Sequence, residues 1–266
     1  MKEKDKMNDD YFINEKSSPL RSIGGLITFS TILPLNIYTS IEEMAKMTYF
    51  WPIISAFVGL IGFLIVYFLN MFQFPILVIS VIIYSFFIWF NGFHHLDGLM
   101  DIGDALMVHG NPEKKIAVMR DSMIGTGALS SFFIVAIVTI ALLDSLISAG
   151  IIGAILVCEM SGKIGLISCC VTSIPAPTGT GKHFIESMTI PKFIIILIIC
   201  IAIAYFFSNF IGIMGVLGGI FGGALISFIG KKNFKIATGD VLGASNEVGR
   251  LFSLLFMLIA FITFSI

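Results

Sequence analysis

Three aspartates and two histidines lie within residues 91–106, NGFHHLDGLMDIGDAL, in a chain of which only 12% of the residues are charged. His94, Asp97, Asp101 and Asp104 are spaced by three, four and three residues, which places them on one face of a helix. Their carboxylates repel one another, and Mg²⁺ or Mn²⁺, which prefers carboxylate oxygens, would offset this cost. We therefore expect Asp97, Asp101 and Asp104 to bind a metal, with His94 beside the substrate.

A metal held by carboxylates is typical of phosphoryl transfer, in which it neutralises charge on the attacking and leaving oxygens. Gly98 and Gly103 weaken the helix by about 1 kcal/mol each relative to alanine, and we interpret them as places where a substrate approaches the backbone. His95 points off the acidic face, so we expect it to pack or to form a hydrogen bond. The alternative is an ordinary solvated acidic face.

The segment MRDSMIGTGAL, residues 119–129, opens the next apolar run. Arg120 suits a phosphate clamp, because the donors of its guanidinium match two oxygens. The helix that follows would offer free N–H groups as an anion site; alternatively, the glycines form a simple turn and Arg120 extends to lipid headgroups. Asp121 either caps this helix or joins the metal site, and Ser122 lies beside it.

Further polar residues lie in or beside later apolar runs. Glu159 and Lys163 are spaced i, i+4, and their pairing is either structural or faces the substrate. In KIATGDVLGASNEVGR, Asp240 and Glu247 are seven residues apart, with Asn246 beside the latter. One helical face can carry all three, so we expect them to complete the metal site or to bind a polar ligand, the alternative being a capped loop.

The segment PAPTGTGKHF is not a P-loop. The P-loop pattern requires glycine at 176 and serine or threonine at 183, where this chain has Ala176 and His183, and no strand precedes it. We expect instead a loop over the site, with Lys182 in contact with an anionic substrate.

The composition indicates a membrane protein that positions these residues. The chain of 266 residues is 57% hydrophobic with a mean hydropathy of +0.99, which favours a bilayer as solvent. We predict an all-α, polytopic helical bundle with about seven transmembrane helices. The predicted spans are 49–68, 75–93, 128–148, 151–172, 192–209, 211–229 and 250–266, the fifth and sixth forming a hairpin. The run at 22–38 is short and contains Pro34, which favours an interfacial or re-entrant helix over a span.

Lysine and arginine occur in every second connection between the predicted spans, and this pattern predicts the orientation of the bundle in the membrane. They occur before the first span and in 94–127, 173–192 and 230–250, whereas NMFQFP, DSLISAG and SNFIG contain none. We therefore expect the polar loops and the active site to face the cytoplasm and the C-terminus to lie across the cell membrane. Because the polar segments share one side, an enzyme is favoured over a transporter.

The remaining features narrow the class further. A net charge of −1 with no basic arm gives no support to nucleic-acid binding. The four cysteines lie in apolar runs without zinc-type spacing, so we interpret them as buried apolar residues. We expect residues 1–21 to form a polar tail without the apolar core of a signal peptide, and residues 22–266 to form one membrane-embedded catalytic domain.

Three motifs, in this order, resemble those of the cobalamin synthase family, the adenosylcobinamide-GDP ribazoletransferases. They are HHLDGLMDIGDAL, AVMRDSMIGTGAL and ATGDVLGASNEV, and ITFSTILPL and WPIISAFVGLIGF are similar to two earlier segments of that family. The resemblance implies an Mg²⁺-dependent membrane enzyme that joins adenosylcobinamide-GDP to α-ribazole or its 5′-phosphate and releases GMP. Asp97, Asp101 and Asp104 would then hold the metal against the diphosphate. The residues in the other two motifs are Asp121, Ser122, Asp240, Asn246 and Glu247.

The chain departs from the family pattern in its cations. STIL lacks the family's arginine, Met123 replaces a basic residue, and Lys163 stands where arginine is frequent. Arg120 and Lys163 remain as candidates for binding the phosphates.

DGLMDIGD also resembles in part the aspartate motif of membrane CDP-alcohol phosphotransferases. Such an enzyme of phospholipid synthesis is the first alternative function, and a cation-coupled transporter is the second. A homo-oligomer and contacts with other enzymes of the cobalamin pathway are partners that remain open.

Overall fold

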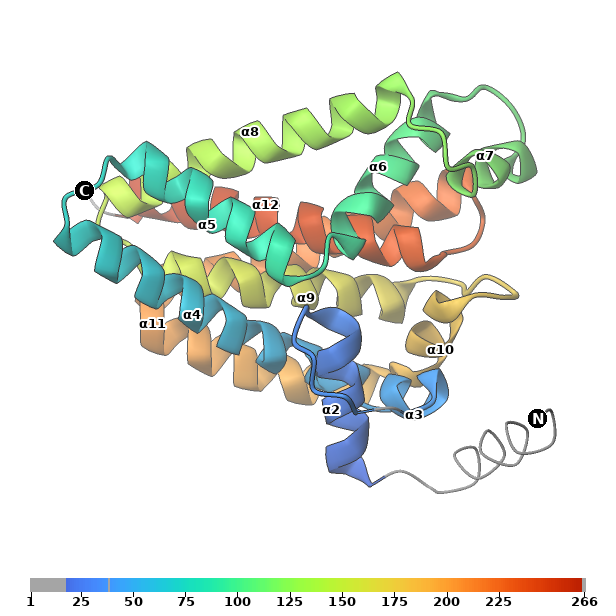
Figure 1. Cartoon of the computed structure of the whole chain (residues 1–266), viewed down its shortest axis with the longest axis horizontal. Helices are drawn as coiled ribbons and strands as arrows, with labels where there is room; N and C mark the ends of the chain where they lie inside the picture. Colours follow the sequence, from blue (N-terminus) through green and yellow to red (C-terminus); the bar gives the residue numbers. More distant parts are fainter. Residues whose placement is uncertain (1–17, 38, 265–266) are drawn as a thin grey trace, which may run out of the picture.

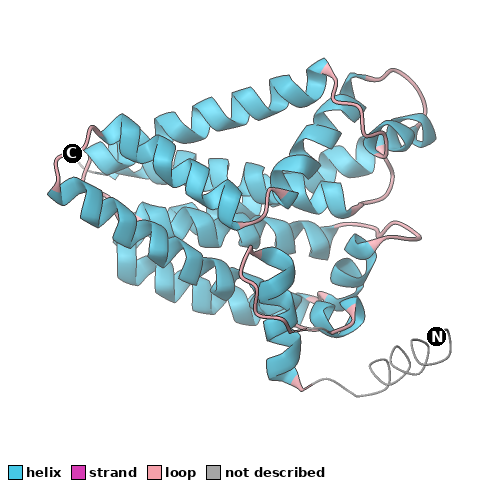
Figure 2. Cartoon of the chain, viewed as in Figure 1, coloured by secondary structure: helices cyan, strands magenta, loops and turns pink. Residues whose placement is uncertain are grey.

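The computed structural model describes residues 18–37 and 39–264. This described part consists of helices and loops, with one isolated bridge between Pro175 and Ala237 (Figure 2). The elements are α2 (Pro19–Ser30), α3 (Ile41–Ala45), the 3₁₀ helix η1 (Thr48–Phe50), α4 (Trp51–Met71), α5 (Ile76–Phe90), α6 (His94–Met107), α7 (Pro112–Met119), α8 (Thr126–Ser148), α9 (Ala154–Thr172), α10 (Thr180–Ser187), α11 (Ile190–Asn233) and α12 (Gly239–Phe264). The predicted all-α bundle is confirmed.

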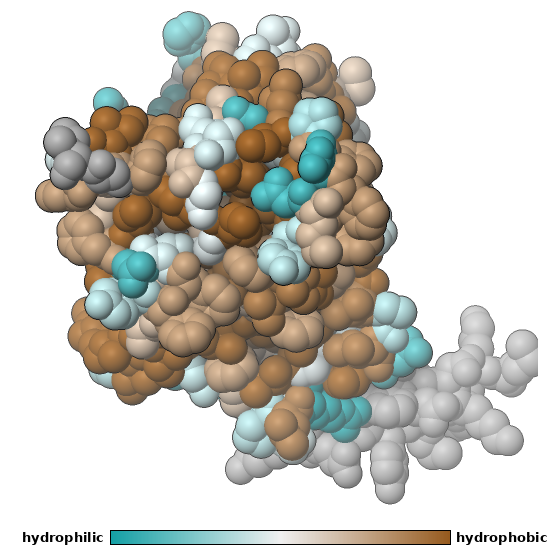
Figure 3. All heavy atoms as spheres, turned by 90° about the vertical axis from the view of Figure 1, so that its left-hand side faces the viewer, coloured by the Kyte–Doolittle hydropathy of each residue, from teal (hydrophilic) through white to brown (hydrophobic). Residues whose placement is uncertain are grey.

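Five helical stretches are long and apolar enough to cross a membrane, and a sixth results if α5 and α6 count as one bent span. Many outward side chains on them are large and apolar; Phe57, Phe133 and Ile198 are 61%, 55% and 63% exposed. Such outward side chains are typical of helices that lipid surrounds. Figure 3 views the molecule from the end at which the α4–α5 and α8–α9 connections lie, and hydrophobic residues cover most of that end as well.

The longest of these stretches, α11, folds back on itself. Ser208 and Asn209 have non-helical backbone angles, and a Cβ added to Gly212 would overlap the carbonyl oxygen of Ala204. In a straight helix, eight residues span about 12 Å, so the chain must reverse between these positions. The predicted hairpin is thus present, and α11 passes along the bundle twice.

Helix α9 runs through the centre of the bundle. Every residue from Ala154 to Cys170 is buried, and small residues let its neighbours approach closely. A Cβ on Gly223 of α11 would overlap the backbone of Gly165 in α9, a packing style common between membrane helices. All four cysteines are free and buried, which confirms their interpretation as apolar packing residues.

Two predicted boundaries differ in the structure. The last span begins at Gly239 rather than at 250, because the polar groups of the preceding segment find partners inside the bundle. Arg250 is consequently a bundle residue and not a loop cation. Helix α2 begins at Pro19, inside the predicted tail 1–21, of which residues 1–17 lie outside the described residues. Its 12 residues span about 18 Å, too little to cross a bilayer, as expected for this segment.

The two ends of the bundle differ. The α4–α5 and α8–α9 connections lie together with the end of α12, whereas α3, α6, α7 and α10 gather at the opposite end (Figure 1). We call this second end the polar end. The described acidic and basic residues singled out in the sequence as site candidates lie at it or in the bundle next to it.

Candidate active site

Two cavities at the polar end share the side chain of Asp97. We name them the aromatic cavity, of about 280 Å³, and the acidic cavity, of about 330 Å³. The aromatic cavity is lined by Phe29, Trp51, His94, His95, Asp97, Leu166, Thr180, Gly181, Phe184, Gly239, Asp240, Leu242 and Gly243. The acidic cavity is lined by Asp97, Met100, Asp101, Asp104, Met119, Arg120, Asp121, Ser122, Met123, Ile124 and Ala128.

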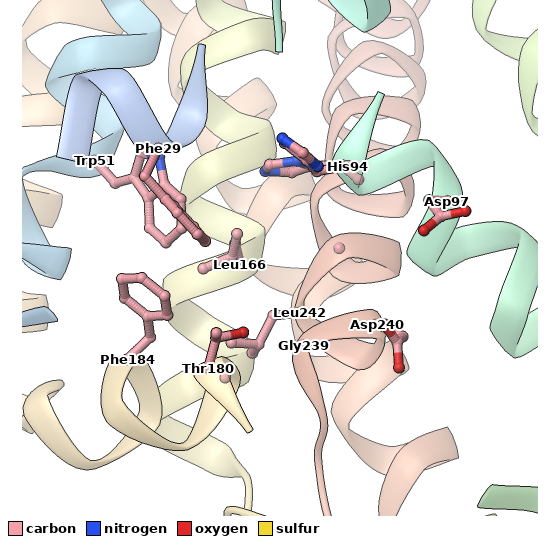
Figure 4. A pocket seen from close by; sticks show the side chains of 13 residues that line it. Phe29, Trp51, His94, Asp97, Leu166, Thr180, Phe184, Gly239, Asp240 and Leu242 are labelled. Carbon is pink, nitrogen blue, oxygen red and sulfur yellow. The ribbon is translucent and has the colours of Figure 1, made fainter. Parts of the chain in front are cut away.

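Figure 4 shows that the aromatic cavity has two unlike sides. Phe29, Trp51 and Phe184 gather on one side, whereas Asp97 and Asp240 lie on the opposite side. A ligand in this cavity can therefore place an apolar part against the rings while a polar part reaches the carboxylates.

A sharp bend before α6 brings its aspartates to the polar end. Gly92 and Phe93 have φ angles of 65° and 61°, a left-handed conformation that phenylalanine rarely adopts. The helix axis turns by 93° between α5 and α6, and the new helix begins at His94. The bend thus converts the end of an apolar span into an amphipathic helix beside the cavities.

Close packing of α6 against α12 brings Asp240 to the aspartates of α6. A Cβ on Gly98 would lie 2.7 Å from the carbonyl oxygen of Asp240, and one on Gly103 would lie 2.6 Å from that of Gly127 in α8. The expectation that a substrate approaches these two glycines is therefore wrong. They are small because neighbouring helices of the same chain approach there.

The carboxylates of α6 and α12 lie close enough together to repel one another. Partial burial and the negative charges of Asp97, Asp240 and Asp104, in that order, raise the pKa of Asp101 to about 7. Within the described residues, no three His, Cys, Asp or Glu side chains are close enough to form a complete metal site. Mg²⁺ in phosphoryl-transfer sites usually takes one or two carboxylates and completes its shell with water and substrate phosphates. The donor set therefore fits this kind of ion.

Asp104 holds the start of α8. Its two carboxylate oxygens accept hydrogen bonds from the backbone N–H groups of Gly125 and Ala128, at 2.7 and 2.9 Å. This helix has no capping side chain of its own, because its N-cap is Gly125. The expected anion site at the start of α8 is therefore already occupied by a carboxylate of the chain itself. Asp104 still lines the acidic cavity.

The second motif lies on the other wall of the acidic cavity. Arg120, Asp121 and Ser122 are exposed there, and Arg120 is close enough to Asp240 to interact with its charge. The carboxylate of Asp121 accepts a hydrogen bond from Met123 N at 3.1 Å, so it stabilises a turn and does not cap α8. The acidic cavity thus combines carboxylates with one arginine that can contact a phosphate.

Lys182 lies on α10 and forms an exposed ion pair with Glu186, at 3.8 Å. It does not line either cavity, although its neighbours Thr180, Gly181 and Phe184 line the aromatic one. Helix α10 therefore lines the site through residues other than the lysine, whereas no residue of the preceding loop lines the aromatic cavity.

Beneath the aromatic cavity lies a network of buried polar side chains. Its members, none more than 6% exposed, are Asn91, His95, Glu159, Lys163, Asn246, Glu247 and Arg250. Arg250 donates from Nε to Glu159 at 3.0 Å and from Nη1 to Glu247 at 2.5 Å. With Lys163, the formal charges of this group sum to zero when His95 is neutral. Balanced and hydrogen-bonded charges are the form in which ionisable groups are tolerated inside a membrane protein.

Lys163 and Glu159 do not pair directly. Lys163 donates to His95 Nε2 at 2.8 Å and to Asn246 Oδ1 at 2.9 Å, whereas Asn91 donates to Glu159 at 2.9 Å. The expectation that His95 forms a hydrogen bond away from the acidic face is confirmed. Since His95 also lines the aromatic cavity, it joins the network to that cavity.

The third motif is therefore divided between two places. Asp240 lies at the cavities, while Glu247 and Asn246, two helical turns further along α12, lie in the buried network without lining either cavity. Lys163 is likewise buried in the network. Glu247, Asn246 and Lys163 therefore lie in the buried network beneath the site and do not line either cavity.

Sequence reasoning missed both the aromatic wall and Arg250. Phe29, Trp51 and Phe184 come from α2, α4 and α10. They lie in the quoted segments ITFSTILPL, WPIISAFVGLIGF and PAPTGTGKHF, but in a chain that is 13% aromatic nothing distinguishes these rings from the others. Arg250 carried a usable signal, because it follows Glu247 at i, i+3 and so shares its helical face.

Comparisons with known proteins identify the family of the chain. The family model described as cobalamin-5-phosphate synthase matches residues 22–258. A relative from Picrophilus torridus, named adenosylcobinamide-GDP ribazoletransferase, is 31% identical over 91% of this chain and 99% of its own length. Relatives of the same name from Methanosarcina barkeri and Acetivibrio thermocellus are 29% and 32% identical, over 86% and 84% of this chain and 88% and 90% of their own. No solved structure matches. The chain belongs to the cobalamin-5-phosphate synthase family.

Proposed function

We propose that this protein transfers the phosphocobinamide group of adenosylcobinamide-GDP to α-ribazole or its 5′-phosphate and releases GMP. The observation that carries the proposal is the position of Asp97 in the walls of both cavities. A nucleophile held in one cavity and a diphosphate held in the other would meet at this carboxylate. Family membership favours this reaction over phospholipid synthesis and over transport.

In the proposed reaction, a ribazole hydroxyl oxygen attacks the phosphorus that is bonded to cobinamide. A new P–O bond forms, and the bond from this phosphorus to the bridging oxygen of the diphosphate breaks. GMP leaves with that oxygen and its electron pair, and the hydroxyl proton passes to solvent or to a nearby carboxylate. Arg120, across the acidic cavity from Asp101, is placed to contact the phosphate oxygens.

Mg²⁺, with Mn²⁺ as a substitute, is the cofactor that we propose for this step. Asp97 and Asp101 are the candidate ligands, because they are adjacent on α6, partly exposed and, unlike Asp104, not engaged in capping another helix. Bound there, the cation would neutralise negative charge on the diphosphate and on the leaving GMP. The raised pKa of Asp101 supports the need for a positive charge at this position.

We further propose that the polar end faces the cytoplasm. The described lysines at this end include Lys46, Lys115, Lys182 and Lys231, whereas the connections 72–75 and 149–153 at the other end contain no basic residue. Cytoplasmic loops of membrane proteins carry such an excess. Both water-soluble substrates would then enter from the compartment that the cavities face.

The test measures GMP release by the purified full-length protein in lipid nanodiscs. Release is expected only when both substrates and Mg²⁺ are present, and Asp97→Asn should lower it by roughly a hundredfold or more, because metal stabilisation supplies several kcal/mol. Asp144→Asn is the matched control, since Asp144 lies in α8 near the opposite end of the bundle. Folded protein that releases no GMP, or an Asp97→Asn variant as active as Asp144→Asn, would overturn the proposal.

A further inference from the structure

One side of the aromatic cavity carries two nearly parallel rings. The rings of Phe29 and His94 are inclined by only 11°, and their centroids are 6.4 Å apart. Offset-stacked aromatic pairs have centroids about 4.5–7 Å apart, so these two side chains form one such pair, which we call the ring pair. Both residues line the cavity, so a flat ligand in it can pack against this pair.

Two further aromatic side chains lie beside the ring pair. Phe184 lies 5.3 Å from Phe29 and 5.0 Å from Trp51, measured between centroids. Trp51 and Phe184 are only 3% and 2% exposed, whereas Phe29 is 36% exposed and so forms the accessible wall. Base-sized aromatic ligands are commonly held by such stacking surfaces.

We infer that the aromatic side of this cavity, at Phe29 and His94, binds the flat bicyclic base of the ribazole nucleophile. The inference rests on the proposed function, which supplies two nucleosides as candidates. A benzimidazole base has an apolar outline, which matches the apolar rings on this side. Guanine has several donors and acceptors along its edge, and the aromatic side of the cavity offers few polar groups to them.

Size and geometry agree with this assignment. A cavity of about 280 Å³ lies just below the range of about 300–1,000 Å³ for drug-sized ligands, so it suits a nucleoside and is too small for a corrin ring. With the base against the rings, the sugar points to the side where Asp97 and Asp240 lie (Figure 4). The hydroxyl group is thereby directed to the border with the acidic cavity, where the diphosphate binds.

Binding can be measured without turnover, through the fluorescence of Trp51. The chain has two tryptophans, and Trp89 lies 52% exposed on α5, away from the cavity. In a Trp89→Phe background, α-ribazole should therefore quench the remaining emission, and guanosine at the same concentration should not. The quenching should weaken in Phe29→Ala but persist in Phe57→Ala, a matched phenylalanine on the lipid-facing side of α4.

The KM values of the two substrates provide a second test of the inference. Phe29→Ala and His94→Ala should raise the KM for α-ribazole by roughly tenfold to a hundredfold and leave the KM for adenosylcobinamide-GDP unchanged, as expected from the loss of one stacking partner. His94→Phe should recover most of the affinity that His94→Ala loses, because it restores a flat ring. A histidine that binds metal or moves a proton would not be replaced by phenylalanine.

The outcomes separate this inference from the proposed function. Wild-type protein that releases no GMP contradicts the function, whatever its fluorescence shows. Wild-type protein that releases GMP, combined with a Phe29→Ala variant whose KM rises for adenosylcobinamide-GDP instead, leaves the function intact and overturns the assignment of the aromatic cavity to the ribazole base. Quenching by guanosine in place of α-ribazole overturns it as well.

Discussion

The acidic cavity and the buried network contain the same kinds of side chain and differ in how their charges are balanced. In the network, two carboxylates meet a lysine and an arginine, and all four residues are nearly inaccessible to solvent. In the acidic cavity, the carboxylates of α6 are partly exposed and repel one another. The charges of the buried network neutralise one another within the chain, whereas a bound cation would stabilise the carboxylates of the acidic cavity. The comparison separates residues that maintain the fold from residues that perform chemistry.

The largest expected effect comes from breaking the balance of the network. Arg250→Met leaves Glu159 and Glu247 without their shared partner, and the loss of one member of a buried ion pair costs about 3–5 kcal/mol. We expect little folded protein, measured by thermal unfolding in detergent. The double variant Arg250→Met/Glu247→Gln is neutral again and should be more stable than the single variant. Equal stability of the two would contradict the role of charge balance.

The acidic cavity should respond in the opposite way. Asp101→Asn removes one of the repelling charges at a partly exposed position, so the free energy of unfolding should stay within about 1 kcal/mol of the wild type. GMP release should nevertheless fall by roughly a hundredfold or more if this carboxylate holds the metal. The measurement compares unfolding and GMP release on the same preparation. An Asp101→Asn variant that is less stable but keeps its specific activity would show that Asp101 maintains the fold and is not needed for the reaction.

An intermediate effect is expected at the contact that joins the two regions. Gly98→Ala places a Cβ 2.7 Å from the backbone of Asp240, which forces α6 and α12 apart. Overpacking of this kind costs about 1–3 kcal/mol and should lower GMP release as the aspartates separate. Gly230→Ala is the control, because its Cβ would meet only the two methyl groups of Val241, the nearer at 3.3 Å. Similar losses in both variants would mean that glycine itself, and not this contact, matters.

Asp104 lines the acidic cavity and also stabilises the fold, and its substitution tests which of these two roles matters more. Asp104→Ala removes two hydrogen bonds to the start of α8, and a lost cap costs about 0.5–2 kcal/mol. If Asp104 acts as a cap, stability falls and GMP release changes by less than about tenfold. Loss of GMP release as large as in Asp97→Asn would identify it as a metal ligand, as predicted from its spacing.

The smallest effect is expected at Lys182. Its ion pair with Glu186 is exposed, and such pairs contribute about 0–1 kcal/mol. Lys182→Met should therefore leave unfolding almost unchanged, and the KM for both substrates should shift by less than threefold, because this side chain lines neither cavity. A larger rise in KM would support the prediction that Lys182 contacts the substrate.

Much of this molecule follows from local patterns in its sequence. The apolar runs predict the spans because a bilayer requires a fixed length, and the 3–4–3 spacing of the acids predicts their shared face on α6. Both depend on residues that are near one another in the chain. The alternation of basic and non-basic connections likewise predicts which connections gather at the polar end.

The partners across helices could not be predicted in the same way. Glu247 and Asp240 differ in role because of neighbours from α9 and α6, and spacing within α12 does not reveal those neighbours. Gly98 looked suited to a substrate because a missing Cβ does not show what fills its place. The aromatic wall combines three distant segments, so it exists only after the chain has folded.

The 93° turn at Gly92 and Phe93 also decides how the charges are spread along the axis of α5. If α6 continued in the direction of α5, Asp97 and Asp104 would lie about 10 Å apart along that axis. Because α6 instead runs across the axis of α5, these carboxylates remain near one level along it. One ligand can then reach all of them from one direction.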